Sequence, residues 1–289
     1  MADPKLKEML DAGRFVAAPG VYDLIGVHLA NEVGFDAIYA SGYWMTASAL
    51  GLPDLGLATY TEMIDRVARI AAFSDAPVIA DADTGYGGLV NLHRTVRGYE
   101  KAGVSGIQLE DQVFPKKCGH TPDRPVIPLD EMERKIRVAV DTRSDEALLV
   151  IARTDARTDF GIDEAIRRGN AFAAAGADLV FVEALTSESE MERVCREVSG
   201  RLIANIAPTG VTPVVPVSRL EELGFAAAIF PALTAMTAMA TMEIALRHFR
   251  ETGESDHPEL PNYDFKKACR LFGFDKYRDL AARWEKLES

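Results

Sequence analysis

The sequence predicts a (β/α)₈ barrel of the TIM type, followed by a C-terminal helical extension. The first observation is a recurring phrase, in which a helical segment ends at a glycine and a short apolar run follows. The glycines concerned are Gly34, Gly103, Gly176 and Gly224. Glycine accepts the left-handed conformation that closes a helix. The second observation is that the runs are apolar on both faces, which is typical of parallel strands covered on both sides.

Apolar runs and helical patterns alternate along the chain, which is the third observation. The apolar runs lie within residues 14–20, 31–41, 76–83, 100–111, 147–155, 173–184, 201–208 and 221–232. Helices are expected near residues 23–32, 60–72, 91–101, 130–141, 162–175, 188–198, 217–223 and 234–249. Asp130 and Glu133 form a start resembling a capping box for the fourth of these helices. This repeated alternation favours a barrel over a doubly wound sheet, which usually has fewer strands and a glycine-rich first turn.

The chain divides into two expected parts, a catalytic barrel over residues 1–250 and a helical extension over residues 251–289. A polar stretch after Phe249 separates them. Beyond Phe265, apolar residues recur at helical spacing, which predicts an amphipathic helix. The pattern alone fits packing against the helix's own barrel as well as packing on a neighbouring subunit.

Charge and composition disfavour several classes of partner. The chain of 289 residues has 32 basic and 44 acidic residues and a net charge of −12. A field of this sign disfavours binding to nucleic acid or to an anionic membrane. The N-terminal segment lacks the apolar core of a signal peptide, and the apolar stretch 226–242 is too short for a membrane span. With three cysteines in no framework, these features predict a cytoplasmic protein.

Polar residues follow six successive predicted strands, at the end where barrel active sites lie. They are Ser41, Gly42, Tyr43 and Trp44, then Asp81 and Asp83, Glu110 and Asp111, Arg153, Thr154 and Asp155, Glu183, and Asn205. Asp81 and Asp83 alternate along one strand, so their side chains point the same way. With Glu110 and Asp111 nearby, an oxygen-rich site for Mg²⁺ or Mn²⁺ is expected. The alternative is a pair of hydrogen-bonded aspartates in a turn at the strand end.

The segment 111–129 is much longer than an ordinary loop between a strand and a helix of a barrel, and residues 112–124 are expected to form a lid. It contains the consecutive residues Lys116, Lys117, Cys118, Gly119 and His120. Nearby lysines are expected to lower the pKa of the Cys118 thiol, so that this thiol can deliver a proton and regain it. Cys195 and Cys269 lie in helical patterns and are interpreted as packing residues.

Taken together, these features make the sequence resemble the isocitrate lyase/phosphoenolpyruvate mutase superfamily. The matching segments are YASGY (39–43), LGLPDLG (50–56), DADTGYGG (81–88), NLHRTV (91–96), LEDQVFPKKCGH (109–120), ARTDA (152–156), VEA (182–184) and ANIAPTG (204–210). They cover nearly the whole chain in order, and KKCGH is specific to the lyase branch. The resemblance implies a Mg²⁺-dependent barrel, a homotetramer and a last helix exchanged between subunits.

The resemblance also implies a carbon–carbon lyase. A 2-hydroxy dicarboxylate would lose its hydroxyl proton, and its C2–C3 bond would break in a retro-aldol step that leaves an α-keto acid such as pyruvate. Cys118, Lys117, His120 and Glu183 form the implied catalytic set, in which Cys118 would protonate the carbanion. By the same resemblance, Ser41, Gly42 and Tyr43 would contact the keto-acid portion of the substrate. Asp81 and Asp83 would contact the metal directly, and Asp54 and Glu110 would contact it through water. The substrate carboxylates would be bound by Gly119, His120, Arg153 and Asn205. The base that takes the hydroxyl proton is left open.

Departures from the family pattern narrow the expected substrate. Methylisocitrate lyases carry an arginine for a third carboxylate shortly after the last strand, but residues 230–239 contain none and Met236 takes the best-matching place. Oxaloacetate hydrolases carry a serine near the position of Ala232. We therefore expect a 2-alkylmalate of the 2,3-dimethylmalate type first, methylisocitrate second and oxaloacetate third. A catalytically silent binding barrel would be expected to lack one of Asp81, Asp83, Cys118 or Arg153, and all are present.

Overall fold

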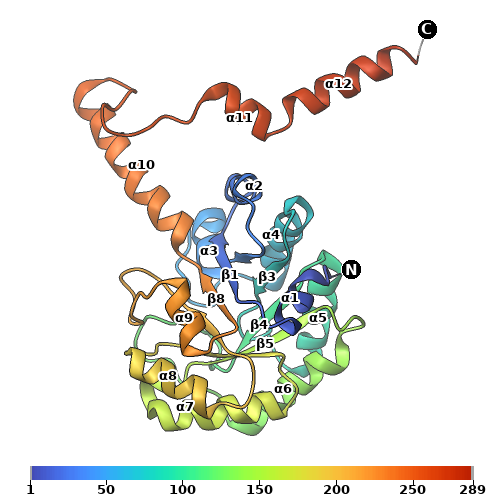
Figure 1. The fold of residues 1–289 in the computed structure, drawn as a ribbon, viewed down its shortest axis with the longest axis vertical. Helices are drawn as coiled ribbons and strands as arrows, with labels where there is room; N and C mark the ends of the chain where they lie inside the picture. Colours follow the sequence, from blue (N-terminus) through green and yellow to red (C-terminus); the bar gives the residue numbers. More distant parts are fainter. Residues whose placement is uncertain (1, 288–289) are drawn as a thin grey trace.

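A barrel of parallel strands forms the centre of the computed structural model, which describes residues 2–287 (Figure 1). The strands are β1 (Val16–Val21), β2 (Ile38–Ala40), β3 (Val78–Asp81), β4 (Gly106–Glu110), β5 (Leu149–Thr154), β6 (Leu179–Val182), β7 (Ile203–Asn205) and β8 (Ala227–Phe230). They are hydrogen-bonded in the order β6-β5-β4-β3-β2-β1-β8-β7. A parallel bridge between Val180 and Leu202 links β6 to β7 and nearly closes the barrel. The predicted (β/α)₈ fold class is confirmed.

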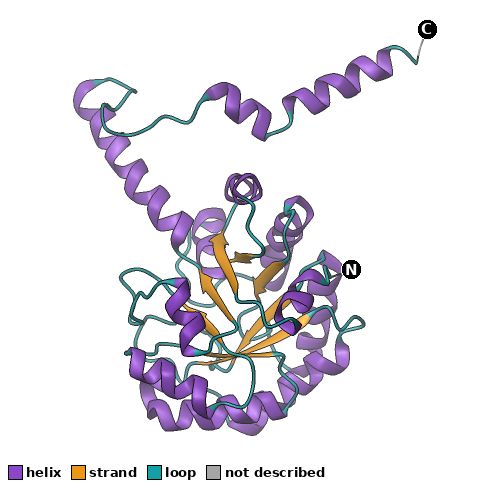
Figure 2. Cartoon of the chain, in the orientation of Figure 1, coloured by secondary structure: helices purple, strands orange, loops and turns teal. Residues whose placement is uncertain are grey.

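Most of the helices surround the strands on the outside of the barrel, whereas the last helices extend away from it (Figure 2). They are α1 (Lys5–Asp11), α2 (Leu24–Val33), α3 (Gly42–Leu50), α4 (Tyr60–Phe73), α5 (Leu89–Ala102), α6 (Leu129–Thr142), α7 (Arg157–Ala174), α8 (Glu188–Glu197), α9 (Val217–Leu223), α10 (Leu233–Thr252), α11 (Phe265–Leu271) and α12 (Phe274–Glu285). The four glycines predicted to close helices all have a positive φ, between 82° and 105°. A residue with a Cβ would be strained in this conformation, which explains why glycine ends these helices.

Several helix starts differ from the sequence prediction: α1 was not predicted, and α7 begins at Arg157 instead of near residue 162. The capping box expected at Asp130 is wrong, because α6 begins at Leu129 with Pro128 as its N-cap, and no side chain caps it. Helix α3 was not predicted at all, since its residues show no clear apolar stripe. It follows β2 directly with Ser41 as its N-cap, and this places its first turn at the end of the barrel where the site lies.

Two layers of buried side chains hold the barrel together. The inner layer fills the barrel axis with strand residues such as Ile79, Ile151 and Phe181. Helix α1 contributes Leu6 and Leu10 to this layer, so it caps the barrel at the amino ends of the strands. The outer layer packs the strands against the surrounding helices. The interior is therefore a packed core, and the polar site is confined to the carboxyl ends of the strands.

The C-terminal segment leaves the barrel along α10 and continues through α11 and α12 (Figure 1). No residue of α11 or α12 is buried. Helix α11 touches α2 at its edge, where the rings of His28 and Phe272 lie 5.3 Å apart and Lys267 lies 3.8 Å from Glu32. Packing on its own barrel is thus slight, and exchange with a neighbouring subunit stays a prediction. Across residues 2–287, no helix is long and apolar enough to cross a membrane.

Candidate active site

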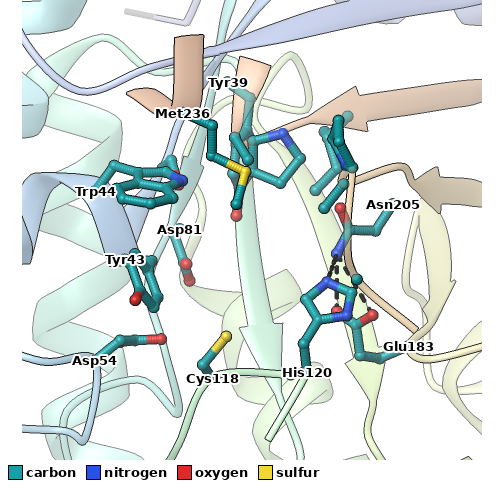
Figure 3. Close-up of a pocket in the computed structure, with 18 of the residues that line it drawn as sticks. Tyr39, Tyr43, Trp44, Asp54, Asp81, Cys118, His120, Glu183, Asn205 and Met236 are labelled. Carbon is teal, nitrogen blue, oxygen red and sulfur yellow. Dashed lines mark hydrogen bonds between the residues drawn. The ribbon is translucent and has the colours of Figure 1, made fainter. Parts of the chain in front are cut away.

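A cavity of about 210 Å³ opens at the carboxyl ends of the barrel strands. Figure 3 shows side chains from several elements converging on it. The predicted site residues that line it are Ser41, Tyr43, Asp54, Asp81, Lys117, Cys118, Gly119, His120, Arg153, Glu183 and Asn205. Three further predicted residues, Gly42, Asp83 and Glu110, lie directly behind this lining and contact it. The structure thus brings the predicted residues together in one place.

Helix α3 presents the first group of these residues. Because the helix begins at the strand end, Gly42 and Tyr43 lie in its first turn, where backbone N–H groups have no partner within the helix. A Cβ on Gly42 would come within 2.6 Å of Oδ2 of Asp81. Glycine is therefore required at position 42 for the helix to approach the carboxylate. The rings of Tyr43 and Trp44 lie 4.5 Å apart and form one side of the cavity.

A buried lysine, Lys116, lies among the strand-end carboxylates, whereas the sequence predicted only that it would lower the pKa of the Cys118 thiol. Nζ of Lys116 is 2.5 Å from Oδ1 of Asp54 and 2.8 Å from Oδ1 of Asp83. Burial raises the pKa of Asp83 to about 6, although the charge of Lys116 opposes this shift. The pair of adjacent lysines in the loop was the available signal, but the sequence could not tell which of the two points inward.

The carboxylates nearest the cavity suit a cation that keeps water in its coordination shell. Within the described range, no group of three or more His, Cys, Asp or Glu residues is placed so that these side chains could hold a metal ion by themselves. Asp81 faces the cavity, while buried Oε1 of Glu110 accepts no hydrogen bond from any described residue. Burial raises the pKa of Glu110 well above its ordinary value. Mg²⁺ is usually bound in this manner, by one or two carboxylates together with water and substrate oxygens.

Asp111 does not belong to this group, contrary to the sequence prediction. Its carboxylate points away from the cavity, accepts hydrogen bonds from Thr154 and from the backbone N–H of Asp155, and pairs with Arg168 at 3.0 Å. Burial raises the pKa of Asp111 to about 6. Asp111 therefore anchors the segment after β4 to the segment after β5.

Arg153 forms the cationic floor of the cavity. Its guanidinium makes two hydrogen bonds to Asp155, at 2.9 and 2.8 Å, and lies 3.3 Å from Glu183 and 3.5 Å from Glu110. Gly119 passes directly over this group, since a Cβ there would collide with both Arg153 and Glu183. The backbone of the loop thus rests on the guanidinium.

Cys118 lies on the long loop and points into the cavity (Figure 3). Its backbone N–H donates to the carbonyl of Asp54 at 3.2 Å. The side chain of Gln112 holds the neighbouring residue by two hydrogen bonds to the backbone of Lys117, at 2.9 and 2.8 Å. The predicted lowering of the thiol pKa is wrong: burial raises it. The ammonium of Lys116 is paired with carboxylates and does not act on the sulfur.

His120, Asn205 and Glu183 form the opposite corner. Nδ2 of Asn205 donates to Glu183 at 3.1 Å and lies 3.5 Å from Nε2 of His120. Nδ1 of His120 accepts from the backbone N–H of Val211 at 3.3 Å, so the ring bridges the loop after β4 and the loop after β7.

One further wall of the cavity is apolar and consists of Trp44, Ile229, Pro231, Ala232 and Met236, while Tyr39 and Thr209 also line the cavity. The cationic side chains that line the cavity are Lys116, Lys117 and Arg153, which come from the loop after β4 and from β5. The sequence placed Trp44 at the end of a strand and Met236 where methylisocitrate lyases carry an arginine. It could not show that both residues line the same cavity.

Comparisons with known proteins extend this description. A family model described as phosphoenolpyruvate phosphomutase matches residues 6–250. The chain is 48% identical over 279 residues to a 2,3-dimethylmalate lyase of Eubacterium barkeri, covering 96% of each chain. It is 42% identical over 272 residues to a 2-methylisocitrate lyase of Aeropyrum pernix, covering 94% of this chain and 87% of the relative.

Solved structures give the same relationship. A structure of oxaloacetate acetylhydrolase with 3,3-difluorooxalacetate has a TM-score of 0.92 and 33% identity, covering 97% of this chain and 96% of that one. A phosphonopyruvate hydrolase in complex with oxalate and Mg²⁺ has a TM-score of 0.88 and 28% identity, covering 98% of this chain and 99% of that one. The predicted family resemblance and the expected lyase branch are confirmed: this chain belongs to the PEP mutase/isocitrate lyase superfamily.

Proposed function

We propose that the protein is a carbon–carbon lyase that cleaves a 2-hydroxy dicarboxylate bearing alkyl groups, of the 2,3-dimethylmalate type. The observation that carries this proposal is the division of the cavity into a cationic floor and an apolar wall. The floor suits the carboxylates of the substrate, and the wall suits alkyl substituents. The identity to 2,3-dimethylmalate lyase supports the same substrate.

The roles proposed for the residues follow from where they lie. In the first turn of α3, the backbone N–H groups of Gly42 and Tyr43 would bind the keto-acid portion together with the side chain of Ser41, because the backbone N–H of Ser41 already donates to the carbonyl of Val21 at 3.1 Å. Arg153, Gly119, His120 and Asn205 would bind the substrate carboxylates. Glu183 would position two of these groups, because it contacts both Arg153 and Asn205. Lys117 would hold the anionic fragment.

A divalent cation, Mg²⁺ or Mn²⁺, is part of this proposal. Asp81 would bind it, with Asp54 and Glu110 acting through water. Asp83, which was expected to bind the metal directly, pairs with Lys116 behind the cavity lining and would also act through water. When bound, such an ion would orient the C1 carboxylate and the C2 oxygen of the substrate and stabilise negative charge on them. Lys116 would keep Asp54 and Asp83 in place by pairing with both. The complex of a related hydrolase with oxalate and Mg²⁺ supports this assignment.

In the proposed reaction a base takes the hydroxyl proton, the C2–O bond becomes a carbonyl, and the C2–C3 bond breaks. The bonding electron pair remains on C3 and takes a proton from the thiol of Cys118. Because burial raises the pKa of this thiol, it stays protonated at neutral pH, which suits an acid. The loop holds the thiol over the cavity, where it can reach the carbanion.

A substrate panel tests the proposal. Purified protein with Mg²⁺ should release keto acid from 2,3-dimethylmalate faster than from 2-methylisocitrate, and should hydrolyse oxaloacetate least. Met236→Arg should shift this preference toward 2-methylisocitrate, because a cation in the apolar wall would pair with its third carboxylate. Met239→Arg, on the same helix but outside the cavity, is the matched control. The proposal fails if no member of the panel is cleaved, or if oxaloacetate is the preferred substrate.

We also propose a cytoplasmic homotetramer with exchanged C-terminal helices, in which residues 1–250 form the barrel and 251–289 the extension. The exposed apolar side chains of Phe265, Phe274 and Trp284 support an intersubunit role for the extension. The unpaired thiols support a reducing compartment. Removing residues from Phe265 onward should give smaller and less stable species by light scattering. A truncated chain that remains a stable tetramer would contradict the exchange.

A further inference from the structure

Arg124 is a buried arginine at the end of the loop that carries Cys118, and the roles above do not include it. Its side chain is 1% exposed. Nη2 donates to the hydroxyl of Thr158, at the start of α7, at 2.6 Å. Nη1 donates to the carbonyl of Cys118 at 3.4 Å and lies 3.5 Å from Oδ1 of Asp155. One guanidinium therefore contacts both the backbone of the loop at Cys118 and the segment after β5.

Asp155 links this guanidinium to the floor of the cavity. Its carboxylate is fully buried and lies between two arginines, since Oδ1 is also 2.8 Å from Nη2 of Arg153. Burial disfavours ionisation of Asp155, but the charges of Arg153 and Arg124 outweigh it and hold its pKa below the ordinary value. Each arginine thus helps to fix the carboxylate that orients the other.

These contacts connect two parts of the site that act on different ends of a substrate. Cys118 comes from the loop after β4, and Arg153 comes from β5. The carbonyl of Cys118 also accepts from the backbone N–H and the hydroxyl of Thr121, at 3.0 and 2.7 Å, so it ends a tight turn. Arg124 connects this turn to the Asp155–Arg153 pair directly, and Gln112, which holds the backbone of Lys117, also hydrogen-bonds Asp155.

We propose that Arg124 is a positioning residue that couples the placement of Cys118 over the cavity to the orientation of Arg153, through their shared contacts with Asp155. Arg124 does not line the cavity, so it would act through its neighbours. A displacement of about 1 Å in a reacting group can cost roughly 10²-fold in rate. The expected effect of Arg124 on kcat rests on the proposed function. Its expected effect on the position of the loop rests on the geometry alone.

The first test measures the loop without any turnover. Endoproteinase Lys-C cleaves after Lys116 or Lys117 when the loop leaves the cavity, and Arg124→Met neither creates nor removes a lysine. Arg124→Met should speed this cleavage by roughly tenfold. Arg124→Lys adds a lysine to the loop, so its partial rescue is measured as kcat and not as protection. Arg143→Met is the matched control, because Arg143 pairs with Asp178 at 2.5 Å near the opposite end of β5 and touches neither the loop nor Asp155.

The second test uses steady-state kinetics with 2,3-dimethylmalate and Mg²⁺. Arg124→Met should lower kcat by roughly 10–100-fold and raise KM, while Arg143→Met should lower the melting temperature and leave both parameters close to those of the wild type. In a Cys118→Ser background, adding Arg124→Met should change kcat by less than about threefold, because residues that act as a unit are not additive.

The outcomes separate the two proposals. A wild type that cleaves no dicarboxylate rejects the proposed function, and the Lys-C rates still decide the role of Arg124. If Arg124→Met is as protected as Arg143→Met, the coupling is wrong. The coupling is also wrong if the loss of kcat is undiminished in the Cys118→Ser background, since Arg124 would then act independently of the thiol.

Discussion

Adding one methyl group at Gly119 should disable the site without unfolding the protein. In Gly119→Ala the new Cβ would lie 2.7 Å from Oε2 and 2.8 Å from Cδ of Glu183, and closer still to Nη2 of Arg153. Ordinary contacts of a Cβ are about 3.5–4.0 Å, so the loop or its neighbours must move by roughly 1 Å. The two neighbours are fixed by their own partners, Arg153 by Asp155 and Glu183 by Asn205. The loop must therefore retreat.

A retreat of this size gives the magnitude of the expected effect. Misplacing Cys118 by about 1 Å should lower kcat/KM by roughly 10²-fold, equivalent to about 2.7 kcal/mol of transition-state stabilisation. The assay is keto-acid release from 2,3-dimethylmalate, together with thermal unfolding. Gly88→Ala is the matched control, because a Cβ at Gly88 meets nothing within 4 Å and its φ is −75°. A Gly119→Ala enzyme with kcat/KM near that of the wild type would refute the reasoning.

Four further predictions follow, three from the site and one from Cys195 in α8. Asp81→Asn should abolish the stimulation of activity by Mg²⁺, and EDTA should abolish the activity of the wild type until Mg²⁺ is added back. Activity that changes neither with this substitution nor with EDTA would contradict the metal site. Cys118→Ser should lower kcat by about 10²–10⁴-fold with no covalent adduct in intact-mass spectra. Since burial raises the pKa of this thiol, wild-type activity should persist to a more alkaline pH than an unperturbed thiol of pKa about 8.5 allows. A loss of activity below that pH would contradict this prediction. Burial raises the pKa of Cys195 to about 12. The stability gained from this neutral thiol is complete below the unfolded pKa of about 8.5 and is lost as the pH rises toward 12, so Cys195→Ala should flatten the alkaline part of the stability curve measured by denaturant unfolding.

The barrel was predictable because its signals are local and repeat along the chain. A glycine that closes a helix and a run that is buried on both faces recur with each unit, and neither depends on distant contacts. Helix α3 was missed because its residues carry no apolar stripe, and its position is set by the strand that precedes it. The start of α6 was misplaced because Pro128 precedes Leu129 and fixes the turn before Asp130 becomes available as a cap.

The site was predictable in its membership but less so in its electrostatics. Strand ends must meet at one rim, so the gathering of Asp81, Arg153 and Glu183 follows from topology. The direction of a pKa shift depends on distances that a sequence does not contain. Lys116 is two residues from Cys118 in the chain, yet its ammonium is bound by Asp54 and Asp83, and burial decides the behaviour of the thiol.

Helix α1, which caps the amino end of the barrel, affects how substrate and products exchange during the catalytic cycle. With Leu6 and Leu10 filling the amino end of the barrel and strand side chains filling its axis, the part of the chain that the structure describes leaves the cavity open at the carboxyl end alone. Both fragments of a cleaved molecule must leave by the route through which the next molecule arrives. The fragment that departs last occupies the entrance and competes with fresh substrate. We therefore expect the fragment that dissociates last to inhibit the enzyme in competition with substrate. Its rate of dissociation sets how soon the next substrate can bind.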